Sequence, residues 1–306
     1  MSSSGKNLLP YLALLLTSIV WGTTWVASKV GINTGIHPLY FSGLRQLWAG
    51  TVYLIIFSAL GKAIWPSKKE WGNILLMSLL LFVFSNGLTT WGLKYITSGL
   101  GAIIGATFPL FVAIIDFARG STDKPNKTST FGLILGFAGV AIVFYEYLVD
   151  FTNADFYIGI VLSLVAAFTW ASGTVLTSKI KTSLNKYYAL GWQMFMAGVI
   201  LVGVCLLAGY ATPFQQISAE GWWALSYMVG FGSMLAFAAF VYMLQHLPSS
   251  LASIYGYVNP IVTVFVGHFW LGEKWSFMLL IGAMVTLAGI YLVNLGFRLQ
   301  LKARRH

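Results

Sequence analysis

Apolar runs of about 20 residues recur along nearly the whole of the chain, separated by short polar segments. A helix of that length crosses a hydrocarbon layer of ~30 Å. The chain is 58% hydrophobic and 8% charged, whereas soluble domains carry about 25% charged residues. These features predict an all-α integral membrane protein and leave no room for a soluble domain.

Ten transmembrane helices account for the apolar runs. Their expected residues are 9–30, 38–60, 71–92, 96–117, 130–148, 156–179, 187–209, 221–244, 248–270 and 276–298. The first run follows a single lysine and has no clear small-residue cleavage site. We therefore interpret it as a retained span and not as a removed signal peptide.

Basic residues concentrate on one side of this membrane layout. Fourteen of the 18 Lys and Arg fall in the segments on the side of the N-terminus, three (Lys29, Lys94 and Lys274) fall on the opposite side, and Arg45 lies within a span. Cytoplasmic segments of membrane proteins carry the excess of Lys and Arg. We therefore expect both termini in the cytoplasm and the protein in the cytoplasmic membrane.

The net charge of +10 comes from short basic clusters between apolar runs, a pattern typical of cytoplasmic membrane loops. It therefore does not indicate nucleic-acid binding. Cys205 is the single cysteine and lies in an apolar run, so a disulfide within the chain is impossible. We expect no cysteine-based metal site and no cofactor.

An internal repeat organises the sequence. Residues 99–109 recur 151 positions later as residues 250–260, with Leu, Ile, Gly and Pro in register. Small residues four positions apart let helix backbones approach closely in lipid, and a proline follows in each copy where a helix would kink or open. The hinge or gating positions predicted on this basis are Gly101, Gly105, Pro109, Gly256 and Pro260.

The repeat extends to the other spans. Gly43, Arg45 and Gly50 of span two correspond to Gly191, Gln193 and Gly198 of span seven, and Gly132 and Gly139 of span five correspond to Gly282 and Gly289 of span ten. Five spans per repeat is an odd number, so the two halves cross the membrane in opposite senses. This predicts two inverted five-helix repeats, in residues 1–148 and 156–298, followed by a basic cytoplasmic tail at 299–306.

Several motifs carry a family resemblance. They are Trp21-Gly22-Thr23-Thr24-Trp25, Phe41-Ser42-Gly43-Leu44-Arg45 with Ala49, the Gly- and Ser-rich starts of spans four and nine ending at Pro109 and Pro260, and Leu271-Gly272-Glu273 before Gly282-Ala283 and Gly289. With these motifs in order and duplicated, the chain resembles the drug/metabolite transporter superfamily, specifically ten-span members built from two EamA-type repeats. After span four the first half has Asp116-Phe117-Ala118-Arg119-Gly120 where the second has Leu-Gly-Glu, so the halves are not equivalent there.

The resemblance implies a transporter that exports small metabolites, amino acids among them, across the cytoplasmic membrane. Relatives also carry nucleotide sugars, phosphosugars and drugs, so the resemblance does not identify the cargo. Two inverted halves of similar energy suit alternating access. The sequence leaves the oligomeric state open, and a monomer suffices for this mechanism.

Arg45 is the arginine placed well inside a span, where an unpaired charge is costly. It either binds a substrate carboxylate or phosphate through its planar guanidinium, or it has a structural role, in which it ties helices together through backbone carbonyls or snorkels outward along its methylene stem. Gln193, its counterpart in the repeat, offers a neutral donor and acceptor.

Aromatic and polar side chains on the span faces complete the candidate substrate site. Each is either a wall of the pathway or a packing residue of the bundle, because aromatic residues are abundant here and buried polar groups in lipid need partners. Beside Arg45 and Gln193, the candidates are Trp21, Trp25, Asn86, Thr90, Trp170, Tyr242, Tyr255, Tyr257 and Asn259.

No Asp or Glu falls in the middle of a predicted span. Proton pumps usually bury a carboxylate, so we favour facilitated diffusion or exchange over carboxylate-centred proton coupling. A membrane enzyme would need clustered His, Asp or Glu, but the four histidines lie at span ends or in the tail. A passive channel and a lipid-moving or drug-moving member of the same superfamily remain alternatives to an amino-acid exporter.

Overall fold

A computed structural model describes residues 8–118, 126–146, 154–177, 180, 182–247, 255–274 and 276–303. These residues form helices and no strand. In chain order the helices are α1 (Leu9–Asn33), α2 (Pro38–Ala59), α3 (Lys68–Met77), η1 (Ser78–Gly87), α4 (Leu88–Gly92), α5 (Ser98–Ala106), α6 (Phe108–Ala118), α7 (Lys127–Glu146), α8 (Ala154–Thr177), α9 (Lys186–Leu207), η3 (Phe214–Gln216), α10 (Ala219–Tyr227), η4 (Met228–Leu235), α11 (Ala236–His246), α13 (Tyr255–Leu271) and α14 (Phe277–Ala303).

Seven helices in the described part of the chain are long and apolar enough to cross a membrane. They span Leu9–Asn33, Lys68–Gly92, Ser98–Ile115, Ala154–Thr177, Lys186–Leu207, Ala219–His246 and Phe277–Gly296. The helix α2, which carries Arg45 and Gln46, and the 17-residue α13 are not among them. The ten-span count and the cytoplasmic placement of both ends therefore stay predictions.

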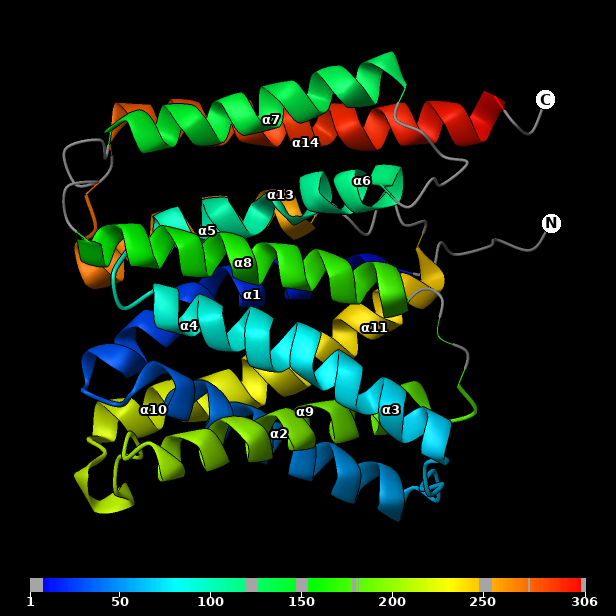
Figure 1. Ribbon diagram of the computed structural model, residues 1–306, viewed down its shortest axis with the longest axis vertical. Coiled ribbons are helices and arrows are strands. Elements are labelled where there is room, and N and C mark those ends of the chain that lie inside the picture. Colours follow the sequence, from blue (N-terminus) through cyan, green and yellow to red (C-terminus); the bar gives the residue numbers. More distant parts are fainter. Residues whose placement is uncertain are drawn as a thin grey trace.

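The long helices lie side by side and roughly parallel in one bundle (Figure 1). The pair α7 and α14 forms one edge, and α2 and α9 lie at the opposite edge. Between these edges α1 packs against α10, α11 and α13, while α8 packs against η1, α4, α5 and α6. These two inner groups correspond to each other under the sequence repeat, and α5 meets α13 between them.

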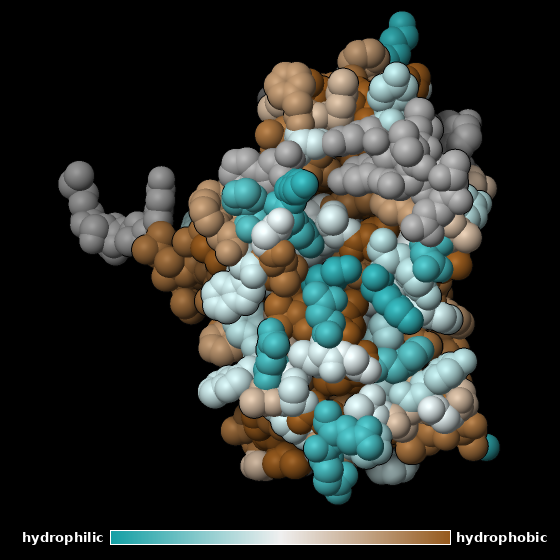
Figure 2. Space-filling model, turned by 90° about the vertical axis from the view of Figure 1, so that its left-hand side faces the viewer, coloured by the Kyte–Doolittle hydropathy of each residue, from teal (hydrophilic) through white to brown (hydrophobic). Residues whose placement is uncertain are grey.

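Polar side chains gather on the end of the bundle where α5 and α10 begin, with apolar side chains around them (Figure 2). Exposed apolar side chains are numerous on the helices themselves, among them Leu207, Phe269 and Trp270. A soluble monomer rarely exposes so much contiguous apolar surface. The distribution agrees with a bundle whose sides face lipid and whose ends face water.

At each edge of the bundle, a helix of the first repeat packs against its own counterpart in the second repeat: α2 against α9, and α7 against α14. A Cβ atom on Gly198 of α9 would lie 2.3 Å from the backbone nitrogen of Leu47 on α2, and one on Gly139 of α7 would lie 2.3 Å from that of Thr286 on α14. A larger residue therefore cannot occupy either position without separating the helices. The repeated glycines of these spans are the means by which the edge pairs approach so closely.

Two spans contain π-helical segments at corresponding positions, η1 in the first repeat and η4 in the second. A π-helical turn leaves backbone groups that neighbouring side chains must satisfy in lipid. Around η4 the indole nitrogen of Trp21 donates to the carbonyl of Gly232 (3.1 Å), and the Tyr53 hydroxyl donates to that of Met234 (2.7 Å). On η1 the Asn86 amide donates to the carbonyl of Leu81 (2.7 Å).

The two copies of the repeated segment, residues 99–109 and 250–260, differ in backbone conformation. In the first, the helix is interrupted at Thr107, so that α5 ends at Ala106 and α6 begins at Phe108, next to Pro109. In the second, α13 continues through Pro260 without a break. Residues 250–254, which open the second copy, lie outside the described residues.

Candidate functional site

A cavity of about 140 Å³ lies between the two inner helix groups. An engineered cavity of about 150 Å³ binds benzene, so this space suits a small organic molecule. Its wall is built from parts of α1, α2, η1, α4, α5, α6, α8, α11 and α13. Ten of the residues predicted from the sequence line it: Trp21, Trp25, Arg45, Asn86, Thr90, Gly105, Trp170, Tyr255, Gly256 and Asn259.

Arg45 enters the cavity wall from α2 and is 6% exposed. Its Nε donates a hydrogen bond to the hydroxyl of Ser233 on η4 (2.7 Å), and its Nη1 donates to the Asn86 side-chain oxygen on η1 (3.3 Å). Neither acceptor is charged, and Arg45 is the charged residue among the described residues that line the cavity. A buried guanidinium with neutral partners retains a strong preference for an anion.

Asn86 and Thr90 are held one helical turn apart beside Arg45. The Thr90 hydroxyl donates to the carbonyl of Asn86 (2.8 Å), and the Asn86 oxygen faces the guanidinium. Ser85 and Thr89 line the same stretch of wall. This part of the cavity is therefore polar, with hydroxyl and amide groups surrounding one cation.

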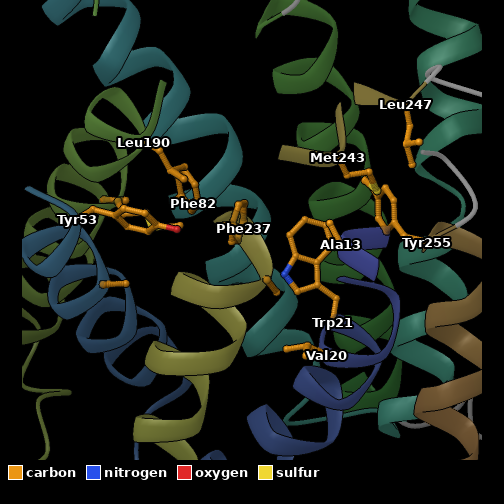
Figure 3. Close-up of a cluster of buried hydrophobic side chains, with 14 residues drawn as sticks. Ala13, Val20, Trp21, Tyr53, Phe82, Leu190, Phe237, Met243, Leu247 and Tyr255 are labelled. Atoms are coloured by element: carbon orange, nitrogen blue, oxygen red, sulfur yellow. The ribbon is translucent and has the colours of Figure 1, made fainter. Parts of the chain in front are cut away.

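Another part of the cavity wall is aromatic and is centred on Trp21. Its indole lies between Phe237 and Tyr255 (Figure 3), with ring centroids at 4.9 and 5.2 Å, and Trp170 meets it edge-on at 6.3 Å. Phe108 stacks on Tyr255 at 6.1 Å. Such edge-to-face clusters are rigid and apolar, so they offer a fixed surface to an apolar group.

Trp25 occupies the space left by two glycines of residues 99–109, the first copy of the repeated segment. A Cβ on Gly105 would lie 2.7 Å from the Trp25 ring, and one on Gly101 would lie 3.2 Å from it. The sequence predicts that these glycines let helix backbones approach closely, but the partner here is an indole ring. Gly101 also faces Leu93 and does not line the cavity.

We expect Gly105→Ala to displace the Trp25 ring, because a Cβ 2.7 Å from an indole cannot be accommodated. Overpacking of this kind costs about 1–3 kcal/mol. Gly256→Ala is the matched control, since Gly256 holds the corresponding place in the repeat and its Cβ would meet Phe108 at an ordinary 3.4 Å. Thermal unfolding of the detergent-solubilised variants, followed by size-exclusion chromatography, should show a loss for Gly105→Ala alone. Equal losses in both variants would contradict the assignment.

Asn259 both lines the cavity and ties α13 to α1. With its amide nitrogen facing the two carbonyls, it donates to Tyr255 on its own helix (3.0 Å) and to Ser18 on α1 (2.8 Å). One turn further, the Thr263 hydroxyl donates to the carbonyl of Gly22 (2.7 Å). Asn259 therefore fixes α13 against α1 close to the place where Trp21 and Tyr255 are in contact.

Three predicted substrate residues lie outside the cavity wall. The Tyr257 hydroxyl meets the Asn294 amide on α14 at 2.5 Å, so this ring points away from the cavity. Tyr242 stacks on His246 at 4.1 Å. Gln193 is half-buried on α9. Of the predicted hinge positions, Pro109 and Pro260 also lie away from the wall.

Sequence reasoning missed Ser233, the closest partner of Arg45, and Phe237. A signal for Ser233 was present, because it lies 148 positions after Ser85, the same offset that relates Gly50 to Gly198. Ser85 lines the cavity and Ser233 binds Arg45. Phe237 corresponds to Thr89 under this offset, so the repeat places an aromatic ring in one half where the other has a hydroxyl.

Known proteins resemble the chain over its full length. The model of the EamA-like transporter family matches it twice, at residues 8–145 and 157–295. The uncharacterized inner membrane transporter YedA of Escherichia coli K12 is 31% identical over 95% of this chain and 92% of its own, and the uncharacterized transporter YoaV of Bacillus subtilis is 28% identical over 94% and 97%. A crystal structure shares the fold over both whole chains, with a TM-score of 0.64 and 16% identity. The chain therefore belongs to the EamA-like transporter family.

Proposed function

We propose that the protein is a secondary transporter that exports small amphipathic carboxylates, in the first place amino acids with apolar or aromatic side chains. The observation that carries this proposal is the position of Arg45, a buried cation with two neutral partners on the wall of a cavity that is also lined by an aromatic cluster. The proposed location is the cytoplasmic membrane, with both ends of the chain in the cytoplasm. A monomer carries the whole cavity.

Arg45 supports recognition of a carboxylate. A guanidinium presents paired N–H donors in a plane that matches the two oxygens of a carboxylate. Its Nε and Nη1 donate to Ser233 and Asn86, so an entering carboxylate would compete with two neutral acceptors for the guanidinium. Because the guanidinium is already desolvated, an entering anion exchanges its water for charge-assisted hydrogen bonds.

The aromatic part of the wall supports recognition of an apolar body. Trp21 and Tyr255 present ring faces and edges that are fixed by Phe237 and Phe108. A ligand that extends from Arg45 toward these rings buries an apolar group there at about 25 cal/mol per Å². An α-ammonium group can lie on the aromatic faces or meet hydroxyl groups of the polar wall.

The helix grouping supports alternating access. The cavity lies between the group of α1, α10, α11 and α13 and the group of α8, η1, α4, α5 and α6, which correspond to each other in the sequence repeat. Rocking of one group against the other would open the cavity to one face of the membrane at a time. No described residue of the wall is a carboxylate, which favours exchange or facilitated diffusion over proton coupling through an acidic side chain.

Counterflow in liposomes tests this proposal. Purified protein is reconstituted with a high internal load of phenylalanine, and labelled phenylalanine is added outside. We expect transient accumulation of label that saturates with concentration, because a carrier exchanges internal for external solute. A passive channel would show no accumulation above equilibrium.

Three competitors then define the recognised group. Phenylalanine and 3-phenylpropionate both carry a carboxylate and should inhibit counterflow, whereas phenylalaninamide lacks it and should not. Each good charge-assisted hydrogen bond contributes about 1.5–3 kcal/mol, so we expect at least a tenfold difference in half-inhibitory concentration. Equal inhibition by the amide and the acid would contradict carboxylate recognition and direct the search to sugars, nucleosides and lipids.

A further inference from the structure

The segment that joins α4 to α5, residues 93–97, is held from both sides by charged residues of the opposite helix group. Glu273, which follows α13, reaches the first turn of α5. Lys29, near the end of α1, reaches the carbonyls just after α4. Both charged residues contact backbone between Leu93 and Gly99, at the end of the bundle where α5 begins (Figure 1).

The Glu273 carboxylate caps α5. Its Oε1 accepts a hydrogen bond from the backbone nitrogen of Ser98 (2.7 Å), and its Oε2 accepts from the Ser98 hydroxyl (2.9 Å) and the Gly99 nitrogen (3.2 Å). A helix N-terminus has free N–H groups and a positive dipole end, so a carboxylate there is doubly favoured. The Leu-Gly-Glu tripeptide of the second repeat therefore acts on a helix of the first.

Lys29 satisfies the other side of the segment. Its ammonium donates to the carbonyl of Leu93 and to that of Ile96 (2.9 Å). These carbonyls follow the last turn of α4, where backbone acceptors lack helical partners. Lys29 and Glu273 thus hold carbonyls and amides of one short segment with opposite charges, and we call this arrangement the clasp.

The clasp is adjacent to the cavity. Leu93, whose carbonyl binds Lys29, lines the cavity wall, and so does Ser28, the residue before Lys29 in α1. Leu93 and Ile96 of this segment are buried, as is Ser98 directly after it, whereas Lys94 is exposed. The clasp therefore borders the cavity wall through Leu93 and Ser28.

Gly267 of α13 leaves the room that the clasp needs. A Cβ there would lie 2.7 Å from the Glu273 Oε2 and 2.8 Å from the Ser98 hydroxyl. A methyl group at this position would thus push the carboxylate off α5. The clasp depends on both the charge of Glu273 and the absence of a side chain at Gly267.

We propose that the clasp is the gate at this end of the transport pathway: Glu273 and Lys29 hold α5 and the α4–α5 segment against α1 and α13, and their release opens the cavity to this face of the membrane. The proposal rests on the alternating access proposed above but not on the identity of the substrate. Glu273 and Lys29 act as positioning residues, because they touch the mobile helix group and not the solute.

Cysteine accessibility tests the gate without a substrate. On a Cys205→Ala background, Ser28→Cys places a thiol in the cavity wall beneath the clasp. A membrane-impermeant maleimide is applied to one face of membrane vesicles at a time. Glu273→Gln replaces an acceptor with a donor facing Ser98 and Gly99, so we expect labelling of the thiol to become about tenfold faster, from the face predicted to be outside.

Lys29→Met and Gly267→Ala should produce the same acceleration, the latter with the carboxylate still present. Lys274→Met and Glu220→Gln are matched controls, because both residues are exposed, lie on the same predicted side and are outside the clasp. Only variants that elute as a single monodisperse species are compared. Unchanged labelling in all three folded clasp variants, fast labelling with the clasp intact, or acceleration from the opposite face would each overturn the proposal.

Discussion

Replacing Arg45 by alanine is expected to abolish saturable counterflow of carboxylate solutes while the protein still folds. The guanidinium is the charged group among the described residues of the cavity wall, so its loss leaves a carboxylate with only neutral donors. Loss of charge-assisted hydrogen bonds weakens binding by about 1.5–3 kcal/mol, which corresponds to roughly 10- to 150-fold in affinity. Initial rates of counterflow at several external concentrations give the affinity and the maximal rate separately.

Two further substitutions at Arg45 separate a binding role from a structural one. Arg45→Lys keeps the charge but loses the planar pair of donors, so it should retain part of the activity with weaker affinity. Arg45→Met removes the charge and keeps most of the volume, and it should match alanine in transport. Removing an unpaired buried cation is not expected to destabilise the fold, because its desolvation cost disappears with it.

A purely structural role for Arg45 predicts a different pattern of stability and transport. If Arg45 only ties α2 to η1 and η4, its variants should lose thermal stability, and those that remain folded should transport normally. Lys62→Met serves as the reference for loss of a positive charge elsewhere in the protein, because Lys62 is exposed and lies outside both the cavity and the clasp.

Gly198→Leu is expected to prevent formation of the folded protein. A Cβ at Gly198 would lie 2.3 Å from the nitrogen and 2.4 Å from the Cα of Leu47, so the clash is with backbone and cannot be relieved by a rotamer change. The whole of α9 must then move away from α2. Overpacking a well-packed core usually costs about 1–3 kcal/mol and occasionally more, and a backbone clash belongs to the upper end.

Gly203→Leu on the same helix is the matched control. No atom lies within 4 Å of a Cβ at Gly203, and a leucine there would meet lipid, which is as apolar as the side chain. Fluorescence-detected size-exclusion chromatography of tagged variants should show a monodisperse peak for Gly203→Leu and aggregate for Gly198→Leu. A monodisperse, heat-stable Gly198→Leu protein would show that α2 and α9 do not pack this closely.

The sequence predicted the helical membrane fold and the correspondence between its two halves, although not which corresponding helices pack together. Positions such as Gly50 and Gly198 recur at one offset, and small residues at fixed spacing in an apolar run have few functions other than close packing. Arg45 could be predicted as part of a site because a charge within a span is costly and needs an explanation.

Side-chain direction was less predictable. Tyr255 and Tyr257 are two residues apart on one helix, so they point to different sides, and nothing in their own sequence says which side faces the cavity. The structure turns Tyr255 toward Trp21 and Tyr257 toward α14. The π-helical segments add to the difficulty, because they change the phase of the helix just where Asn86 and Ser233 approach Arg45.

The role of Glu273 was also hidden in the sequence. Its tripeptide supports the family resemblance, but its hydrogen-bonding partners lie about 175 positions earlier in the chain. Contacts between residues so far apart follow from the packing of α5 against α13, which no local pattern contains. The same holds for Trp25, whose ring fills the space above Gly105.

The pairing of α2 with α9 has a consequence for the chemistry of duplicated proteins. In a symmetric assembly of two identical half-length chains, any residue on one of these helices would also be present on the other, so a single arginine could not exist. Two guanidinium groups would then share one low-dielectric interior, and each would raise the cost of the other. Joining both halves in one polypeptide allows Arg45 on α2 to have a neutral counterpart, Gln193, at the corresponding position of α9, so the duplication of the helix does not duplicate its charge.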